Sequence, residues 1–406
     1  MKKRYAMRSF LAGAAAARAG DEMSGPALLL AGFAIGGSVT EASSLLAGIT
    51  VSAAVGGPVL GALLDRSPKP GRLLAWALAL YAAGLMVILL SLGRLPIELT
   101  VLIAVFTGLL GPALSGGWTA QLPRVVPRDG MPRANALDAM TFSVASLVGP
   151  ALAAALAKLL GAPAAVVASA ALIAFALPAA WTLPARHGPK RVRPPTSVGG
   201  LKRVRPPTSV ADDLAAGFRC ITRTRPLARA TLTSVISCTG LGMLITCTPL
   251  LGERAFASAA DGTMLLSCTA VSALAANAVL ARRPRAIAPD TVIWSSTLLL
   301  AAALLMAATG HPALVVTAAL TAGLGEGPQL VALFAVRHRE APERLRGQVF
   351  TTGASLKITG FALGAAAAGP IATRSLPAAL LTAAGVQVAA CLSFHAFASG
   401  RTASYD

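Results

Sequence analysis

The sequence is poor in charged and aromatic residues. Only 13% of its 406 residues are charged and 5% are aromatic, whereas 55% are apolar and the mean hydropathy is +0.70. Soluble globular domains contain about 25% charged residues, so this composition excludes that class and indicates an integral membrane protein. The net charge of +19 does not indicate nucleic-acid binding, because such proteins gather their charge on a soluble face, often with aromatic platforms.

The motifs of metal sites, cofactor sites and active sites are also missing. No Cys-x-x-Cys pair occurs among the five cysteines, and the four histidines lack the spacing of metal ligands. No phosphate-binding loop, nucleotide signature or nucleophile motif is present. We therefore expect no metal, no cofactor, no nucleic-acid partner and no enzymatic or ATP-driven activity.

Long apolar runs make up most of the chain. A hydrocarbon core about 30 Å thick is crossed by a helix of roughly 20 apolar residues. Twelve runs of about this length predict an all-α polytopic protein with twelve transmembrane helices in two six-helix bundles. The predicted spans are 9–34, 39–63, 73–93, 97–121, 136–159, 162–183, 227–250, 262–281, 288–309, 312–335, 348–372 and 376–398.

One long polar interval separates the two sets of spans. It contains a duplication, because KRVRPPTSV at residues 190–198 returns unchanged at 202–210. Its Pro and Arg content is typical of a flexible, solvated linker. The predicted organisation is an N-terminal bundle, a basic cytoplasmic linker, a C-terminal bundle and a short cytoplasmic tail, at residues 1–184, 185–226, 227–398 and 399–406.

The basic residues are distributed on one side of the predicted spans. If the N-terminus is cytoplasmic, that side holds 29 of the 35 Lys and Arg residues. The other side holds four, and Arg18 and Lys357 lie well inside spans, away from their ends. Since cytoplasmic loops are enriched in Lys and Arg, both termini are predicted to be cytoplasmic. Met1–Arg8 resembles the start of a signal peptide, but we interpret it as the start of a retained first span.

Several motifs resemble those of one transporter family. Gly61 to Arg72 forms a Gly-x-x-x-Asp-Arg loop after the second span, and residues 54–66 align weakly with residues 270–282 in the second half. With the 6+6 arrangement, this loop resembles the major facilitator superfamily. Residues 122–127 and 133–137, followed by Gly149-Pro150, resemble its bacterial drug-efflux members. The resemblance implies alternating access, a bacterial inner-membrane location and a substrate site between the halves.

Asp65 ends the second span, where the helix dipole is unfavourable for a carboxylate. The N-terminus of the eleventh span, which begins on the same side, would stabilise this charge. The resemblance also implies that Asp65, with Gly61, Arg66 and Arg72, forms a gate that latches the two halves. The alternative is local pairing of Asp65 with the two arginines.

Charged residues inside the predicted spans are candidates for chemistry, because burying them in lipid is costly. Arg18, Asp21 and Glu22 share one helical face near the bilayer centre, as a proton or substrate site or as a neutralised structural cluster. Glu326 and Lys357 lie at similar depths on neighbouring antiparallel spans, which makes an ion pair plausible. They form either a gate, a site for polar groups of the substrate or a structural pair.

Other polar and small residues receive weaker assignments. Gln329 lies one turn from Glu326 and is a further cavity candidate, whereas Asp138 is assigned to the first turn of the fifth span, with Asn135 as its N-cap. Small residues favour close helix contacts. The predicted packing residues are Gly57, Gly61, Gly149, Pro150, Gly360 and Gly364.

These observations predict a secondary transporter that exports a small amphipathic or apolar compound in exchange for protons. Its expected partners are this small molecule, protons and membrane lipid, and we expect a monomer. The first alternative is proton-coupled import of a small metabolite. The second is a non-transporting receptor or scaffold, against which the charged residues in the spans argue.

Overall fold

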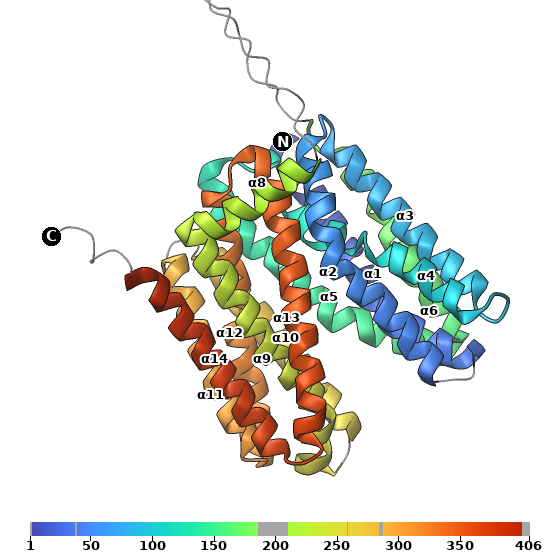
Figure 1. The fold of residues 1–406 in the computed structure, drawn as a ribbon, viewed down its shortest axis with the longest axis vertical. Helices are drawn as coiled ribbons and strands as arrows, with labels where there is room; N and C mark the ends of the chain where they lie inside the picture. The colour runs from blue at the N-terminus through green and yellow to red at the C-terminus, as the bar shows by residue number, and fades with distance from the viewer. Residues whose placement is uncertain (1, 37–38, 186–209, 258, 284–286, 400–406) are drawn as a thin grey trace, which may run out of the picture.

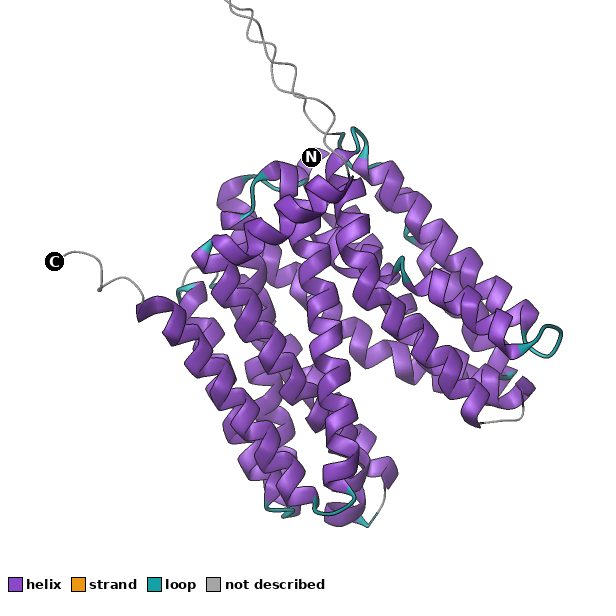
Figure 2. Cartoon of the chain, viewed as in Figure 1, coloured by secondary structure: helices purple, strands orange, loops and turns teal. Residues whose placement is uncertain are grey.

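The computed structural model describes residues 2–36, 39–185, 210–257, 259–283 and 287–399, and these residues form helices and loops without any strand (Figure 2). The first half contains α1 (Lys2–Gly36), α2 (Val39–Arg66), α3 (Pro70–Ser91), α4 (Ile97–Gly108), α5 (Met131–Leu160), α6 (Ala162–Phe175) and α7 (Leu177–Trp181). The second half contains α8 (Val210–Arg223), α9 (Arg225–Phe256), α10 (Ala259–Arg282), α11 (Pro289–Ala308), α12 (Pro312–Glu340), α13 (Arg346–Ala372) and α14 (Leu376–Ser399).

Eleven helical segments in the described part of the chain are long and apolar enough to cross a membrane. The remaining long helix is α1, which carries Arg18, Asp21 and Glu22 near its middle. Together they give the twelve helices that the apolar runs predict. The fourth span is not continuous, however: α4 ends at Gly108, and a π-helical segment at Ala113–Gly117 follows. Pro112 explains the break, because it has no N–H to donate to the preceding turn.

The helices form two bundles that converge at one end and diverge toward the other (Figure 1). We call the end where α8 lies the α8 end, and the other the opposite end. Each bundle has its own apolar core. The bundles contact each other along two pairs of helices, α2 with α13 and α5 with α10. A small apolar cluster that includes Phe334 and Phe350 joins residues of both halves.

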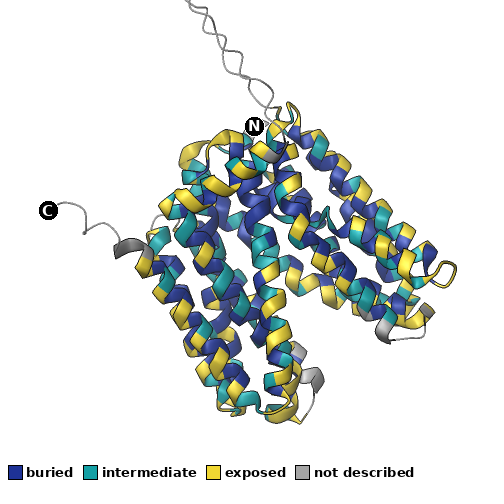
Figure 3. Cartoon of the chain, viewed as in Figure 1, coloured by how far each residue is buried: buried dark blue, intermediate teal, exposed yellow. Residues whose placement is uncertain are grey.

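The outer surface of the bundles is apolar. Large apolar side chains such as Val55, Leu80, Phe175 and Leu392 are exposed, whereas buried residues lie between the helices (Figure 3). A water-soluble protein rarely exposes so extensive an apolar surface. Lipid tails surround apolar side chains without a cost in free energy, so an apolar outer surface is typical of a multi-pass membrane protein.

The segment predicted as a flexible linker contains a helix, α8, which corrects that interpretation for residues 210–223. Leu214, Phe218 and Ile221 recur at helical spacing, and Asp212 and Asp213 lie in the first turn, where the helix dipole favours acids. Asp213 forms an ion pair with Arg66 of α2, and the Leu214 carbonyl accepts a hydrogen bond from Gln348 Nε2 of α13 at 3.2 Å. Helix α8 therefore contacts both bundles. The KRVRPPTSV duplication lies outside the described residues, apart from Val210.

Candidate functional site

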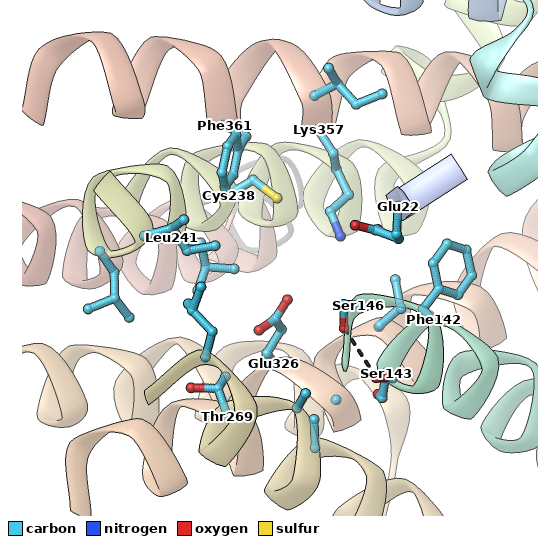
Figure 4. A pocket seen from close by; sticks show the side chains of 18 of the residues that line it. Glu22, Phe142, Ser143, Ser146, Cys238, Leu241, Thr269, Glu326, Lys357 and Phe361 are labelled. Carbon is cyan, nitrogen blue, oxygen red and sulfur yellow. Dashed lines mark hydrogen bonds between the residues drawn. The ribbon is translucent and has the colours of Figure 1, made fainter. Parts of the chain in front are cut away.

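A cavity of about 580 Å³ lies between the two bundles, and we call it the central cavity. Helices α1, α5, α9, α10, α12 and α13 supply most of its wall, which is largely apolar (Figure 4). Its charged lining residues are Arg18, Asp21, Glu22, Glu326, Arg337 and Lys357. The sequence predicted five of these six, and the structure brings residues of the two halves together around one space.

Arg18 is held by a buried polar network through its two terminal guanidinium nitrogens, Nη1 and Nη2. Its guanidinium donates to Asp138 Oδ1 at 2.9 Å, to the Asp138 carbonyl at 3.0 Å and to Thr119 Oγ1 at 2.8 Å, and it also donates to Thr141 Oγ1. Thr119 in turn donates to Asp138 Oδ2 at 2.7 Å, and the Arg18 guanidinium lies 3.7 Å from the centre of the Phe142 ring. Arg18 is therefore a neutralised cation at the end of the cavity.

The assignment of Asp138 to the first turn of the fifth span, with Asn135 as the N-cap, is wrong. Helix α5 begins at Met131, so Asp138 lies two turns inside it and Asn135 is buried within the helix rather than capping it. The early start follows from Pro132, which is favoured in the first turn of a helix. Asp138 is completely buried because it is the counter-ion of Arg18.

Asp21 and Glu22 differ in their surroundings. Asp21 Oδ1 accepts a hydrogen bond of 3.0 Å from the Tyr81 hydroxyl of α3. Glu22 makes no hydrogen bond or ion pair within the described residues and faces the central cavity. Gly149 of α5 permits the close packing here, because a Cβ at this position would lie 2.7 Å from Cβ of Glu22. Pro150, the next residue, lines the cavity.

Glu326 and Lys357 both face the central cavity, but they do not form the expected ion pair. In Figure 4, the Lys357 side chain extends from α13 toward Glu22, and Glu326 points into the cavity from α12. Neither residue makes an ion pair within 4.0 Å in the described part of the chain. Three charged groups from three helices, Glu22, Glu326 and Lys357, thus share the cavity without being bound to one another.

Gln329 does not line the cavity, contrary to the sequence-based assignment. It is buried, and its amide nitrogen donates to Ser237 Oγ of α9 at 3.2 Å. Gln329 is about one turn from Glu326 along α12, but a spacing of three residues falls about 60° short of a full turn, and this offset directs the Gln329 side chain toward α9. Its position indicates a role in packing α12 against α9.

Arg337 is a cavity residue that the sequence analysis missed. It lies within the last turns of α12, has an exposed fraction of 2% and lines the central cavity. Its guanidinium packs against the Phe350 ring, 5.8 Å from the ring centre, and has no hydrogen-bond or ion-pair partner among the described residues. The sequence places it in the basic cluster Arg337-His338-Arg339, which we counted with a cytoplasmic loop.

The central cavity is closed at the α8 end by contacts between the halves. Asp65 of α2 accepts hydrogen bonds from the backbone N–H groups of Gly347 and Gln348, each at 2.8 Å, at the N-terminus of α13. Ser355 donates to the Ala53 carbonyl at 2.7 Å, and its oxygen accepts from the Gly57 N–H at 3.1 Å. Arg66 pairs with Asp213 of α8, and Arg72 lies over the Trp181 ring.

The two predicted glycine pairs have different partners. A Cβ at Gly57 or Gly61 of α2 would collide with Thr351 of α13, so this pair permits contact between the halves. A Cβ at Gly360 or Gly364 of α13 would instead collide with α9, at the carbonyls of Val235 and Thr239. The second pair therefore packs helices within the C-terminal bundle and does not lie at the contact between the halves.

His338 adds a contact that no motif indicated. One of its ring nitrogens lies 3.2 Å from the Thr119 carbonyl in the other half, and the other lies 3.0 Å from the Phe334 carbonyl. Its ring also packs 4.5 Å from the Phe350 ring. His338 thus links α12 to the segment between the π-helical turn and α5.

Comparison with known proteins is consistent with this architecture. The model of the Major Facilitator Superfamily matches residues 10–369. A curated relative, described as an uncharacterized MFS-type transporter y4rN of Sinorhizobium fredii, is 27% identical over 299 residues, which cover 72% of this chain and 69% of the relative.

Two solved structures show the same fold at low identity. The human organic anion transporter MFSD10 (TETRAN) is 17% identical with a TM-score of 0.75, covering 97% of this chain and 100% of its own. A bacterial homologue of the iron transporter ferroportin, in an outward-facing state, is 16% identical with a TM-score of 0.71, covering 97% and 99%.

Proposed function

The chain belongs to the major facilitator superfamily and is a membrane transporter, and from this premise we propose that it exports a small amphipathic compound in exchange for protons by alternating access. The substrate path is the central cavity, and Glu22, Glu326 and Lys357 are its functional charges. The protein works as a monomer in the inner membrane of a bacterium, with both termini in the cytoplasm.

The observation that carries this proposal is the set of cavity charges without partners. A charged side chain at the centre of a membrane helix costs about 2.5–3.5 kcal/mol on insertion scales. Glu22, Glu326 and Lys357 lie in the middle parts of α1, α12 and α13 and face the cavity without an ion pair. A receptor or scaffold would gain nothing that offsets this cost, whereas a transporter uses such groups to bind protons and substrate.

Proton coupling requires groups that change charge and that interact with the substrate. Glu22 and Glu326 lie on different halves of the protein, with the Lys357 ammonium extending toward Glu22 (Figure 4). A proton on either carboxylate removes one negative charge from an apolar space, where charges interact strongly. Asp21, held by Tyr81, is the third carboxylate that a proton can reach in this region.

Asp65 is the gate residue in this proposal. It binds the N-terminus of α13 across the two halves, so the α8 end is shut while the bundles diverge toward the opposite end (Figure 1). The excess of Lys and Arg supports a cytoplasmic location for the α8 end. With that orientation, the structure corresponds to an outward-facing state. The resemblance of residues 122–127 and 133–137 to bacterial drug-efflux members supports export as the direction.

The test is a comparison of bacteria that lack and bacteria that express the protein. Cells lacking it are screened for hypersensitivity across compound classes, and export of each hit is followed with and without a proton gradient. We expect the expressing cells to lose export when the gradient collapses. Asp21→Asn and Glu22→Gln should lose gradient-driven export, with Asp129→Asn, an exposed carboxylate in the loop before α5, as the matched control.

Other outcomes identify the alternatives. Gradient-driven accumulation inside expressing cells would assign the protein to import of a small metabolite. The proposal would be contradicted if no compound moved in either direction and the carboxylate variants had a normal phenotype. That result would favour the receptor or scaffold.

A further inference from the structure

The two buried arginines of the central cavity differ in their partners. Arg18 has Asp138 as its counter-ion, and its Nη1 and Nη2 atoms donate to Asp138, Thr119 and Thr141. Arg337 is equally buried, with an exposed fraction of 2%, but its Nε and Nη2 atoms have no partner within the described residues. An uncompensated buried charge is strongly unfavourable, so retaining it requires a group that binds it in another step of the cycle.

The packing around Arg337 keeps its guanidinium beside α13. Gly353 of α13 leaves the room for it, because a Cβ there would lie 2.8 Å from Nη1 of Arg337 and still closer to its Nη2 and Cζ atoms. The Phe350 ring, one turn earlier on α13, covers one side of the group at 5.8 Å. These contacts position the guanidinium without neutralising it.

Helix α13 places a second cation on the same face. Residues at spacings of three and four share one face of a helix, and Phe350, Gly353, Lys357 and Phe361 follow this spacing. Phe350, Lys357 and Phe361 all line the central cavity, as does Arg337. One wall of the cavity therefore combines two cations with two aromatic rings.

The anionic groups near this wall do not cancel the two cations. Asp138 is bound to Arg18 and Asp21 to Tyr81, which leaves Glu22 and Glu326 as the remaining carboxylates of the cavity. Neither forms an ion pair with Arg337 or Lys357 within 4.0 Å. When protons occupy these two carboxylates, the cavity wall carries an excess of positive charge.

We propose that the central cavity binds an organic anion, whose carboxylate, sulfonate or phosphate group is held by Arg337 with Lys357 and whose apolar part lies against Phe361, Leu241 and Leu244. A guanidinium presents a planar pair of donors that matches such oxyanions. Leu241, Leu244 and Phe361 line the same cavity, and a volume of about 580 Å³ accommodates a drug-sized molecule. This inference rests on the proposed role of the cavity as the substrate path, but it concerns binding and is tested without transport.

The test measures thermal unfolding of the purified, detergent-solubilised protein, because a ligand that binds the native state raises the unfolding midpoint. The soluble probes are phenylbutyrate and naphthalenesulfonate, with phenylbutylamine and phenylbutanol as probes that lack the negative charge. A parallel arm compares phosphatidylglycerol with phosphatidylcholine in mixed micelles, because an anionic lipid headgroup offers the same chemistry. We expect the anions, and not the amine or the alcohol, to raise the midpoint of the parent protein.

The variants assign this response to Arg337. A hydrogen bond to a charged group contributes about 1.5–3 kcal/mol, so Arg337→Gln should weaken anion binding about 10- to 100-fold. Arg337→Lys should retain part of the anion binding, and Lys357→Gln should weaken anion binding less than Arg337→Gln does. Arg339→Gln is the matched control, because this arginine lies two residues away, has a side chain 49% exposed and pairs with Glu340 outside the cavity.

The unfolding midpoint without ligand gives a second readout. Removal of an unpaired buried charge should raise this midpoint in Arg337→Gln, whereas loss of a structural arginine would lower it. A response to phenylbutyrate or naphthalenesulfonate that requires Arg337 assigns the site to soluble anions, and one confined to phosphatidylglycerol assigns it to lipid. Equal responses in Arg337→Gln and the parent, or no response of the parent to any anion, would overturn the inference.

Discussion

Asp65→Asn is the substitution that acts most directly on the contact between the halves. The Asp65 carboxylate accepts two hydrogen bonds of 2.8 Å from consecutive backbone N–H groups at the start of α13. Asparagine retains one acceptor oxygen, and its NH₂ group faces the second N–H, so one charge-assisted hydrogen bond and the attraction to the helix dipole are lost. These terms amount to about 2–4 kcal/mol.

This loss should appear as a change in the population of the closed α8 end. A shift of about 2–4 kcal/mol corresponds to roughly a 30- to 700-fold change in the equilibrium between closed and open states. Spin labels at Lys69 and Arg344, exposed positions on the two halves at this end, report the separation in a cysteine-free background. We expect a single short distance in the parent and a longer distance in Asp65→Asn.

The control for this measurement is Asp129→Asn, which removes an exposed carboxylate at the same end, on the loop before α5. Its distance distribution should match that of the parent. If Asp65→Asn also matches the parent, the hydrogen bonds to α13 do not hold the α8 end closed, and the assignment of Asp65 as the gate residue is wrong.

Three further predictions concern packing and the buried network. Asp138→Asn should destabilise the protein by about 3–5 kcal/mol in thermal or denaturant unfolding, because it leaves Arg18 buried without its counter-ion; an unchanged midpoint would contradict the network. Gly61→Val should open the α8 end with little change in the unfolding midpoint, because Gly61 contacts α13 of the other half. Gly364→Val should instead lower the unfolding midpoint, because Gly364 contacts α9 within its own bundle. Gln329→Leu should lower stability by about 1 kcal/mol through loss of the hydrogen bond to Ser237 and leave transport unchanged; a specific loss of transport would place Gln329 in the substrate path.

Much of the fold was predictable because lipid imposes strong constraints on the sequence. Apolar runs of about 20 residues predicted the helices, and the Gly61 to Arg72 loop predicted where the halves meet. Asp65 illustrates this: helix direction alone indicated that its carboxylate is unfavourable at its own helix end and that a facing N-terminus would stabilise it. The structure places that carboxylate on the N-terminus of α13.

The errors arose where tertiary contacts decide the role of a residue. Asp138 was assigned by its distance from a presumed helix start, but its role is set by Arg18, which is 120 residues away in the chain. Arg337 was counted with a loop because a run of basic residues at a helix end usually lies in water. Helix α8 was missed because the preceding repeat dominates the composition of that interval, although residues 210–223 have an amphipathic pattern of their own.

The most direct test of the account is transport by the purified protein in proteoliposomes with an imposed proton gradient, using a compound identified by the export screen. We predict that the parent accumulates the compound against its concentration gradient. Glu22→Gln and Glu326→Gln should still exchange it across the membrane but should fail to accumulate it, since they cannot carry the coupled proton. Accumulation by both variants to the level of the parent would contradict the claim that these cavity carboxylates couple protons to transport.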